Sequence, residues 1–131
     1  MGWAFKKDTN DSRESAAIYV ADVLLEEGAE LHVYDPMVKV DQIHQDLTIL
    51  WEARSESQQE IESKLKRCIG HQYHMNALQD SFAVAILTEW EEFKTYDWNI
   101  ISYKMIQPAK VYDGRNVLDV NKNINQYYIG K

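Results

Sequence analysis

Apolar positions in the first third of the chain follow the period of a strand, then of a helix, then of a strand again. Residues 2–5 are short, apolar and aromatic, which is typical of a strand. Between residues 16 and 24 apolar side chains recur at three- and four-residue intervals, which predicts a helix that ends at Gly28. Residues 31–34 are strand-like and stop at an Asp-Pro pair. This order predicts a right-handed parallel crossover.

The first predicted strand begins abruptly. Strands usually run for about five or six residues, so residues 2–5 are expected to be the end of a longer strand. Met1 is then expected to be an added start codon. Asp11 or Ser12 is expected to cap the helix that follows.

The rest of the pattern predicts further alternation of helices and strands. Residues 52–67 are charged and lack Gly and Pro, which predicts one mostly exposed helix. Residues 82–87 are apolar without alternation, which is typical of a strand with both faces buried. Shorter strands are predicted at residues 68–69, 110–112 and 127–129, and shorter helices at residues 75–79 and 97–105.

Alternating helices and strands around one buried strand predict an α/β fold. The expected architecture is a doubly wound, mostly parallel, Rossmann-like sheet with helices on both faces, in a single domain over residues 1–131. Ligands of such sheets bind beyond the carboxyl ends of the strands. The loops after Phe5, Tyr34, Leu87 and Tyr112 are therefore expected to lie along one edge.

Composition narrows the class of protein. Of the 131 residues, 45% are hydrophobic and 27% charged, which is typical of a soluble globular protein. No membrane segment or secretory signal is predicted, because no apolar stretch approaches roughly 18 residues. The net charge of −7 argues against nucleic acid, although a small anionic ligand needs only a few donors. The single cysteine, Cys68, excludes an internal disulfide and favours a reducing, cytoplasmic location.

Two of the four loops carry cations. Lys6 and Lys7 follow the first strand, Arg13 is expected just inside the helix that follows, and Arg115 follows Gly114 after a late strand. Lysine, arginine and a helix N-terminus together suit a phosphate or diphosphate. The alternative is that these cations are solvated or paired with their acidic neighbours Asp8, Asp11 and Glu14.

Residues 2–15 closely resemble the G-x-A-F-K-x-x-T-x-D-x-R-x-S segment that opens the C-terminal, UDP-binding domain of UDP-glucose 6-dehydrogenases. Three later stretches agree in order and spacing, at residues 34–36, 88–93 and 113–119, whereas residues 41–77 fit poorly. The resemblance implies an enzyme that oxidises UDP-glucose to UDP-glucuronate with NAD. It also implies that the NAD-binding and central domains of such an enzyme are absent from this sequence.

The resemblance assigns roles to four residues. Phe5, Lys6 and Arg115 are implied to contact the nucleotide sugar, and Arg13 to reach the NAD side of the cleft. No catalytic residue is expected, because Cys68 lacks the family's Gly-Gly-Ser-Cys context and no dinucleotide-binding glycine fingerprint is present. The chain alone is therefore expected to be inactive and to bind nucleotide sugar weakly at best, with NAD bound mainly by the absent N-terminal domain.

Other candidate residues have structural interpretations. Asp35 occupies the position of a ribose-binding acid, but without the glycine fingerprint we interpret it as a turn with Pro36. His71 and His74 are spaced for a shared metal but lack a third ligand, so no metal site is predicted. Trp90 is expected either to pack against the sheet or to line the site.

The expected ligand is UDP-glucose or UDP-glucuronate, with neither nucleic acid nor membrane as a partner. Two alternatives stay open. One is the same domain from an enzyme for a UDP-N-acetyl sugar or GDP-mannose, and the other is a non-catalytic interaction module of the same fold. The family assembles into homo-oligomers through its central region, so this chain is expected to be a monomer or weak dimer.

Overall fold

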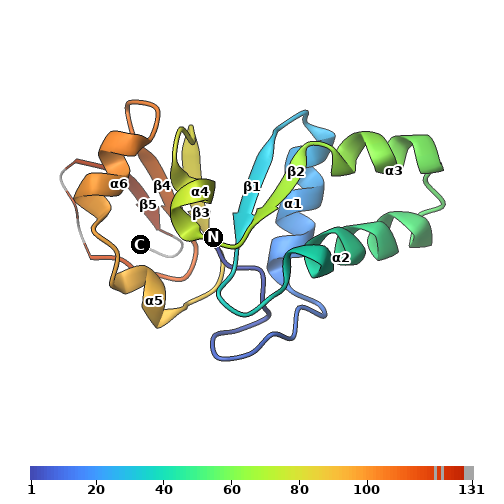
Figure 1. Cartoon of the computed structure of the whole chain (residues 1–131), viewed down its shortest axis with the longest axis horizontal. Coiled ribbons are helices and arrows are strands. Elements are labelled where there is room, and N and C mark those ends of the chain that lie inside the picture. The colour runs from blue at the N-terminus through green and yellow to red at the C-terminus, as the bar shows by residue number, and fades with distance from the viewer. Residues whose placement is uncertain (120, 122, 129–131) are drawn as a thin grey trace.

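The structure is a computed structural model that describes residues 1–119, 121 and 123–128 (Figure 1). Helices and strands alternate along these residues, which confirms the α/β class. The helices are α1 (Ala16–Glu26), α2 (Val40–Ala53), α3 (Gln58–Leu65), α4 (His74–Leu78), α5 (Glu91–Lys94) and α6 (Trp98–Lys104). The strands are β1 (Leu31–Tyr34), β2 (Cys68–His71), β3 (Ala83–Ile86), β4 (Lys110–Asp113) and β5 (Asn125–Tyr128).

The strands form two parallel groups that the N-terminal residues join. β1 pairs with β2, and β3, β4 and β5 pair in that order, all in parallel. Met1 donates to the Ala85 carbonyl (2.8 Å) and accepts from the Leu87 N–H (2.9 Å), as parallel neighbours do. On the other side, Gly2 donates to the Tyr34 carbonyl at 2.8 Å. Counting residues 1–2 as the first strand, the order is the 3-2-1-4-5-6 of dinucleotide-binding folds.

The predicted strand at residues 2–5 is wrong beyond its first residue, and the reason is a side chain. The backbone N–H groups of Trp3 and Ala4 donate to the Asp35 carboxylate, at 2.7 and 2.9 Å. Because those N–H groups are used there, they are not available to a neighbouring strand, and the chain bends away.

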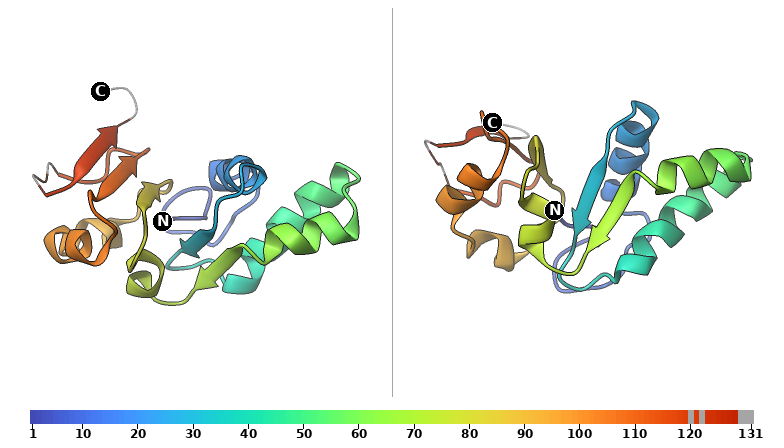
Figure 2. Two further views of the ribbon diagram at one scale, coloured as in Figure 1. Left: turned by 90° about the horizontal axis from the view of Figure 1, so that it is seen from above. Right: turned by 45° about the horizontal axis from the view of Figure 1, so that its top comes forward.

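Helices cover the two faces of the sheet unequally. Figure 2 shows α1 on one side of the strands and α4 and α6 on the other. The prediction that both faces of residues 82–87 are buried is wrong, because Phe82 is 63% exposed and Ala83 is also exposed. Val84 and Ile86 are buried, so one face of β3 packs into the core and the start of the other face is exposed.

The predicted helix at residues 52–67 corresponds to the shorter α3, and its first two residues are the end of α2, which the sequence analysis did not predict. α2 and α3 form an antiparallel hairpin, here called the helical hairpin, that projects beside β2 (Figure 1). The chain turns at Ser55, which has a φ of 60°. Ile43, Leu47 and Trp51 lie four residues apart and are fully buried, so they fix α2 to the domain.

Helix α1 begins later than predicted. Ser15, rather than Asp11 or Ser12, caps it and accepts from the Ala17 N–H at 3.3 Å. Glu14 has a φ of 58°, a left-handed conformation that a helix cannot include, so the helix starts after it. Gly28 closes the helix with a φ of 90°, as predicted.

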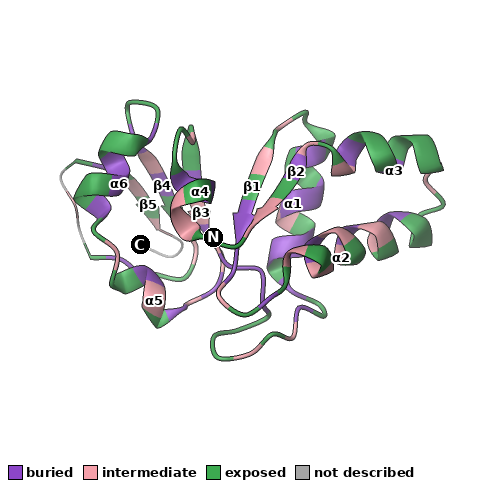
Figure 3. Ribbon diagram, viewed as in Figure 1, coloured by how far each residue is buried: buried purple, intermediate pink, exposed green. Residues whose placement is uncertain are grey.

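The remaining short elements lie within a few residues of their predicted positions. The predicted strand at residues 127–129 is the end of β5, and Ile129 lies outside the described residues. Figure 3 shows buried residues concentrated around β1 and α1, whereas α3 is largely exposed. Among the described residues, no helix has the length and apolar character needed to cross a bilayer.

Candidate functional site

One edge of the sheet gathers the loops that follow its strands. The loop of residues 5–14, the chain after β1 and helix α5 all lie along this edge (Figure 1). Such an edge is where α/β folds bind ligands. Two buried aspartates and one buried threonine hold the loops in place.

Asp35, at the end of β1, connects three of the loops. Its Oδ2 accepts the backbone N–H groups of Trp3 and Ala4 and, at 3.1 Å, the indole N–H of Trp90. Its Oδ1 accepts the N–H groups of Met37 (2.8 Å) and Val38 (3.0 Å). A carboxylate offers about four lone-pair positions, so five donors leave Asp35 none for a ribose. The contacts support a structural role for Asp35 and place Trp90 in the packing.

Thr88 fixes the first loop against β3. Its hydroxyl, fully buried, donates to the Ala4 carbonyl at 2.9 Å. Gly2 crosses the same residue so closely that a Cβ on it would lie 2.6 Å from the Thr88 Cβ. Gly2 also has a φ of 92°, so both space and backbone conformation require glycine there.

Asp113, at the end of β4, organises the last loop. Its side chain is completely buried and accepts the backbone N–H groups of Arg115 (3.2 Å), Val117 (3.0 Å) and Leu118 (2.8 Å). The Arg115 Nε donates to the Leu87 carbonyl at 3.1 Å. The guanidinium of Arg115 is therefore held across the end of β3.

The first and last loops meet at Glu89, which follows β3. Its Oε1 accepts the Lys7 backbone N–H at 3.4 Å, and its Oε2 lies 3.6 Å from the Arg115 Nη1. Lys6, Lys7 and Arg115, here called the cationic rim, thus belong to loops that share one carboxylate. The expectation that two separate loops bring cations to one edge is consistent with this geometry.

The four predicted site residues differ in their surroundings. Phe5 is 51% exposed, and Lys6 is exposed and has no ion pair among the described residues. The Lys7 ammonium lies 3.7 Å from Glu91. Lys6 is therefore the rim cation best able to meet a ligand without first losing a partner.

Arg13 pairs with a neighbouring acid, Asp11, as the alternative interpretation of the sequence expected. Its Nε and Nη2 donate to the two Asp11 oxygens at 3.1 and 2.9 Å, although the Arg13 side chain is 88% exposed. The guanidinium holds the pKa of Asp11 well below its usual range, at about 2. Arg13 must exchange this partner before it can bind another anion.

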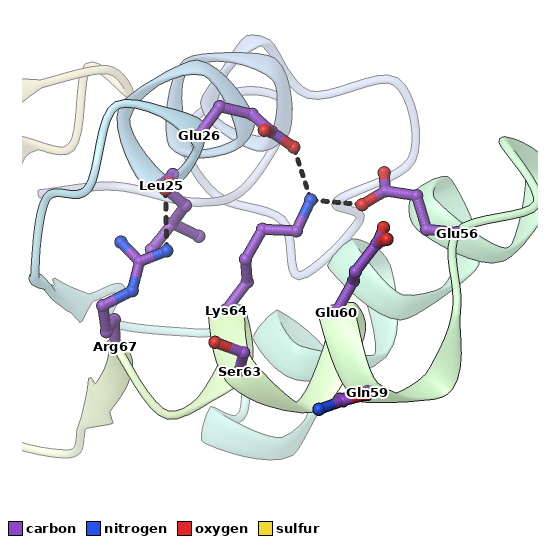
Figure 4. A pocket seen from close by; sticks show the side chains of 8 residues that line it. All are labelled: Leu25, Glu26, Glu56, Gln59, Glu60, Ser63, Lys64 and Arg67. Carbon is purple, nitrogen blue, oxygen red and sulfur yellow. Dashed lines mark hydrogen bonds and ion pairs between the residues drawn. The ribbon is translucent and has the colours of Figure 1, made fainter.

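Two hollows lie away from the rim residues, and the sequence predicted neither. Figure 4 shows the first, of about 600 Å³, between α1 and α3, with Lys64 bonded to Glu26 (2.5 Å) and to Glu56. The second, of about 540 Å³, lies beside α6 and the chain after Arg115. Phe5, Lys6 and Arg115 line neither, so the predicted contacts lie on a more open surface.

Cys68 and the histidines have no sign of a catalytic or metal-binding role. Burial raises the pKa of the Cys68 thiol to about 11, which disfavours the nucleophilic thiolate. His71 bonds to His32 at 2.8 Å, whereas His74 stacks on Tyr96, so the spacing of His71 and His74 brings no shared ligand position. No group of three or more metal-binding side chains occurs among the residues described.

Sequence reasoning missed a cluster of tyrosines around a carboxylate. The hydroxyls of Tyr34 (2.6 Å) and Tyr96 both donate to Glu92 Oε2. Burial, followed by these bonds to a carboxylate, raises the pKa of both tyrosines. The cluster ties α5 to β1, and no local pattern could have indicated it.

The fold and the rim define a class of protein. A parallel sheet in dinucleotide-fold order, with cationic loops beyond its strand ends, is a Rossmann-like nucleotide-binding domain. Residues 1–120 match the UDP-glucose/GDP-mannose dehydrogenase family, UDP binding domain. The chain belongs to this family, which confirms the resemblance of the first motif.

Curated relatives point to one kind of enzyme. The chain is 43% identical over 120 residues to UDP-glucose 6-dehydrogenase of Drosophila melanogaster, covering 91% of this chain and 24% of that protein. It is 40% identical over 125 residues to UDP-glucose 6-dehydrogenase 4 of Arabidopsis thaliana, covering 93% and 26%. The chain thus spans about a quarter of the length of these relatives.

Solved structures agree on the fold. The UDP-D-ManNAc dehydrogenase from Pyrococcus horikoshii superposes with a TM-score of 0.71 at 22% identity, over 98% of this chain and 24% of that one. The UDP-N-acetyl-mannosamine dehydrogenase Cap5O from Staphylococcus aureus gives 0.69 at 23% identity, over 100% and 25%. At this identity the likeness shows the Rossmann-like architecture alone.

Proposed function

We propose that the chain is the nucleotide-sugar-binding domain of a UDP-glucose 6-dehydrogenase, an enzyme that oxidises UDP-glucose to UDP-glucuronate with NAD. The family membership of residues 1–120 and the identity of 40–44% to curated UDP-glucose 6-dehydrogenases support this proposal. The observation that carries it in the structure is the approach of two cationic loops to one carboxylate, Glu89, at the ligand-binding edge.

The rim residues take different parts in binding. Lys6 and Arg115 balance the charge of the diphosphate, and the planar Arg115 guanidinium suits two phosphate oxygens at once. The exposed ring of Phe5 provides an apolar surface beside them. These interactions orient the substrate and stabilise charge, and no bond is made or broken by this chain's own residues.

The residues present do not form an NAD site of their own. Asp35, which occupies the ribose-binding position of a dinucleotide fold, has its acceptors occupied by backbone and indole N–H groups. In the longer enzyme, NAD would accept the hydride from the sugar, and a separate domain would bind the NAD. Arg13 is the one residue proposed here to reach NAD, after exchanging Asp11 for a phosphate.

The chain by itself is proposed to be inactive. Its buried Cys68, with a pKa raised to about 11, is unsuited to nucleophilic attack, so the catalytic thiol belongs to another part of the longer enzyme. In the longer enzyme, this domain is proposed to be the C-terminal one and to close over the nucleotide sugar. That enzyme is proposed to be a cytoplasmic homo-oligomer. The isolated chain is proposed to be a monomer or a weak dimer.

UDP-glucose is favoured over other nucleotide sugars by the relatives. Curated UDP-glucose 6-dehydrogenases share 40–44% identity with the chain, whereas the structures named for UDP-N-acetyl-mannosamine share 22–23%. GDP-mannose and UDP-N-acetyl sugars are the substrates to test against it. An interaction module without a nucleotide has no specific observation in its favour.

Calorimetry of the chain at low salt tests the proposal. We expect saturable binding of UDP-glucose and UDP-glucuronate, weaker binding of GDP-mannose, and no binding of uncharged glucose. Lys104→Ala serves as the control for substitutions of the rim cations, because it removes an exposed lysine of α6 outside the rim. Its affinity for UDP-glucose should equal that of the unaltered chain. Equal binding of GDP-mannose and UDP-glucose would reject the sugar assignment, and no binding of any nucleotide sugar would reject the domain's role.

A further inference from the structure

Glu89 has an unusual position for a carboxylate at an anion-binding edge. Its Oε2 is buried and has no hydrogen-bond partner among the described residues, although the Glu89 side chain as a whole is 32% exposed. The Arg115 Nη1, at 3.6 Å, is close enough for an ion pair and too far for a good hydrogen bond. Glu89 Oε1 has only the long bond, 3.4 Å, from the Lys7 N–H.

A buried carboxylate oxygen without a donor is costly. Charged groups pay for removal from water unless partners replace the lost hydrogen bonds, and Glu89 has replaced them incompletely. Nearby Asp35 and Asp113 show the contrast, because backbone N–H groups reach both oxygens of each. Glu89 is therefore the poorly satisfied acid of this edge, and its position is more readily changed than theirs.

The surroundings of Glu89 explain what holds it in place. Arg115 and the backbone of the Lys7 loop are both groups that would bind a phosphate. Glu89 offers an oxygen to each of them, as a phosphate would. Arg115 is thus matched by an acid whose oxygen is buried beside it, whereas Lys7 meets Glu91 only across the exposed surface.

We propose that Glu89 is an internal competitor for the phosphate-binding groups: it holds Arg115 and the Lys7 loop before a ligand binds and is displaced by the diphosphate of the ligand. This inference rests on the proposed function, because it names what regulates that same site. Glu89 sets the position of Arg115 before binding and lowers the net affinity for the anion.

Glu91 provides a matched comparison. It lies two residues from Glu89, is exposed, and pairs with the ammonium groups of Lys7 (3.7 Å) and Lys94 (3.3 Å). Its charge is the same, but both of its lysine partners are about half exposed to water. Removal of the Glu91 charge should therefore change the affinity for a phosphate ligand little. A general charge effect would act in both variants, whereas competition for Arg115 is specific to Glu89.

The test compares Glu89→Gln with Glu91→Gln in the full chain. Binding of UDP and of inorganic pyrophosphate is measured by calorimetry at low and at high salt, with thermal unfolding midpoints as a check on folding. We expect Glu89→Gln to bind both probes about three- to fivefold more tightly than the unaltered chain at low salt, with a smaller gain at high salt. Glu91→Gln should stay within about twofold of the unaltered chain.

The outcomes separate this inference from the proposed function. If the unaltered chain binds UDP and Glu89→Gln binds it equally or more weakly, competition by Glu89 is wrong and the function stands. An equal gain in Glu91→Gln also overturns it, in favour of bulk charge. If neither probe binds to any of the three chains, the proposed site and the role of Glu89 both fail.

Discussion

The loop edge and the helical hairpin are built by different kinds of interaction. At the loop edge, Asp35 and Asp113 are buried and bind backbone N–H groups, Asp35 those of a loop far away in sequence and Asp113 those of its own loop. In the hairpin, a stripe of apolar side chains packs inward, and the Lys64 ammonium lies over the Trp51 ring and pairs with both Glu26 and Glu56. The first arrangement fixes the positions of individual loops, while the second fixes only the placement of a pair of helices.

This difference separates binding from stability. Damage to the hairpin is expected to lower the free energy of unfolding and leave the affinity of the folded chain for nucleotide sugar unchanged. Damage to the rim is expected to do the reverse. Damage to Asp35 is expected to lower both, because Asp35 holds the loops that carry the rim.

The largest expected effect on stability alone is in the hairpin. Trp51 is fully buried, and its indole N–H donates to Asp22 at 2.8 Å. Trp51→Ala should lower the free energy of unfolding by about 3–5 kcal/mol, measured by urea denaturation. Glu52→Ala, at the exposed neighbour, is the control and should change it by less than about 0.5 kcal/mol.

Asp35→Ala should act on both properties. It removes the acceptor of five N–H groups, several of them buried, so we expect a loss of about 3 kcal/mol or more in the free energy of unfolding. Asp35→Asn keeps part of the acceptor capacity and should lose less. Full UDP-glucose affinity in a folded Asp35→Ala chain would contradict the claim that Asp35 positions the rim.

Removal of a rim cation should weaken binding without a comparable loss of stability. Arg115→Ala and Lys6→Ala are each expected to raise the Kd for UDP-glucose about tenfold, as loss of a charge-assisted hydrogen bond predicts. Calorimetry measures the Kd, and thermal unfolding measures stability. A thermal midpoint that falls while the Kd stays constant would assign these side chains to structure.

The smallest expected effect is a dependence of stability on pH. Burial, and then the neighbouring His32, lower the pKa of His71 below its ordinary value of 6.5. The unfolded chain therefore takes up a proton at His71 more readily than the folded chain as the pH falls through 6.5. The free energy of unfolding should decrease from about pH 7.5 to about pH 5.5.

His71→Gln tests the origin of this pH dependence. The variant should have a shallower dependence of urea midpoint on pH than the unaltered chain. His44→Gln is the control, since His44 bonds to the Cys68 carbonyl and, unlike His32, is not among the groups that lower the pKa of His71. An identical slope in His71→Gln and the unaltered chain would show that other groups cause the dependence.

Much of the fold follows from local pattern. The period of α1 and the Asp-Pro stop after β1 depend on neighbours in sequence, and they predicted a helix and then a strand at these places, although α1 starts later than expected. The helix α2 was missed because its inward face consists of only three buried residues, Ile43, Leu47 and Trp51, separated by mostly polar ones. The packing of α2 against β2 depends on tertiary contacts, which a local pattern does not indicate.

The candidate site was predictable in part. The resemblance implied roles for Phe5, Lys6 and Arg115, which stay predictions, and the fold rule predicted that their loops share one edge, as the contacts of Glu89 support. The contacts of Glu89, and the Asp35 contacts with Trp3, Ala4 and Trp90, join segments far apart in the sequence, which no sequence period records. The pairing of Arg13 with Asp11 is local, and it was an alternative that the residues themselves offered.

The central claim is that the loops of Lys6 and Arg115 bind one ligand together. Titration of the isotope-labelled chain with UDP-glucose, followed by amide chemical shifts, tests it most directly. The account predicts saturable changes at residues 5–7, 89 and 113–115 with a single Kd, and none in α3. Changes confined to one of the two loops, or different Kd values for them, would contradict it.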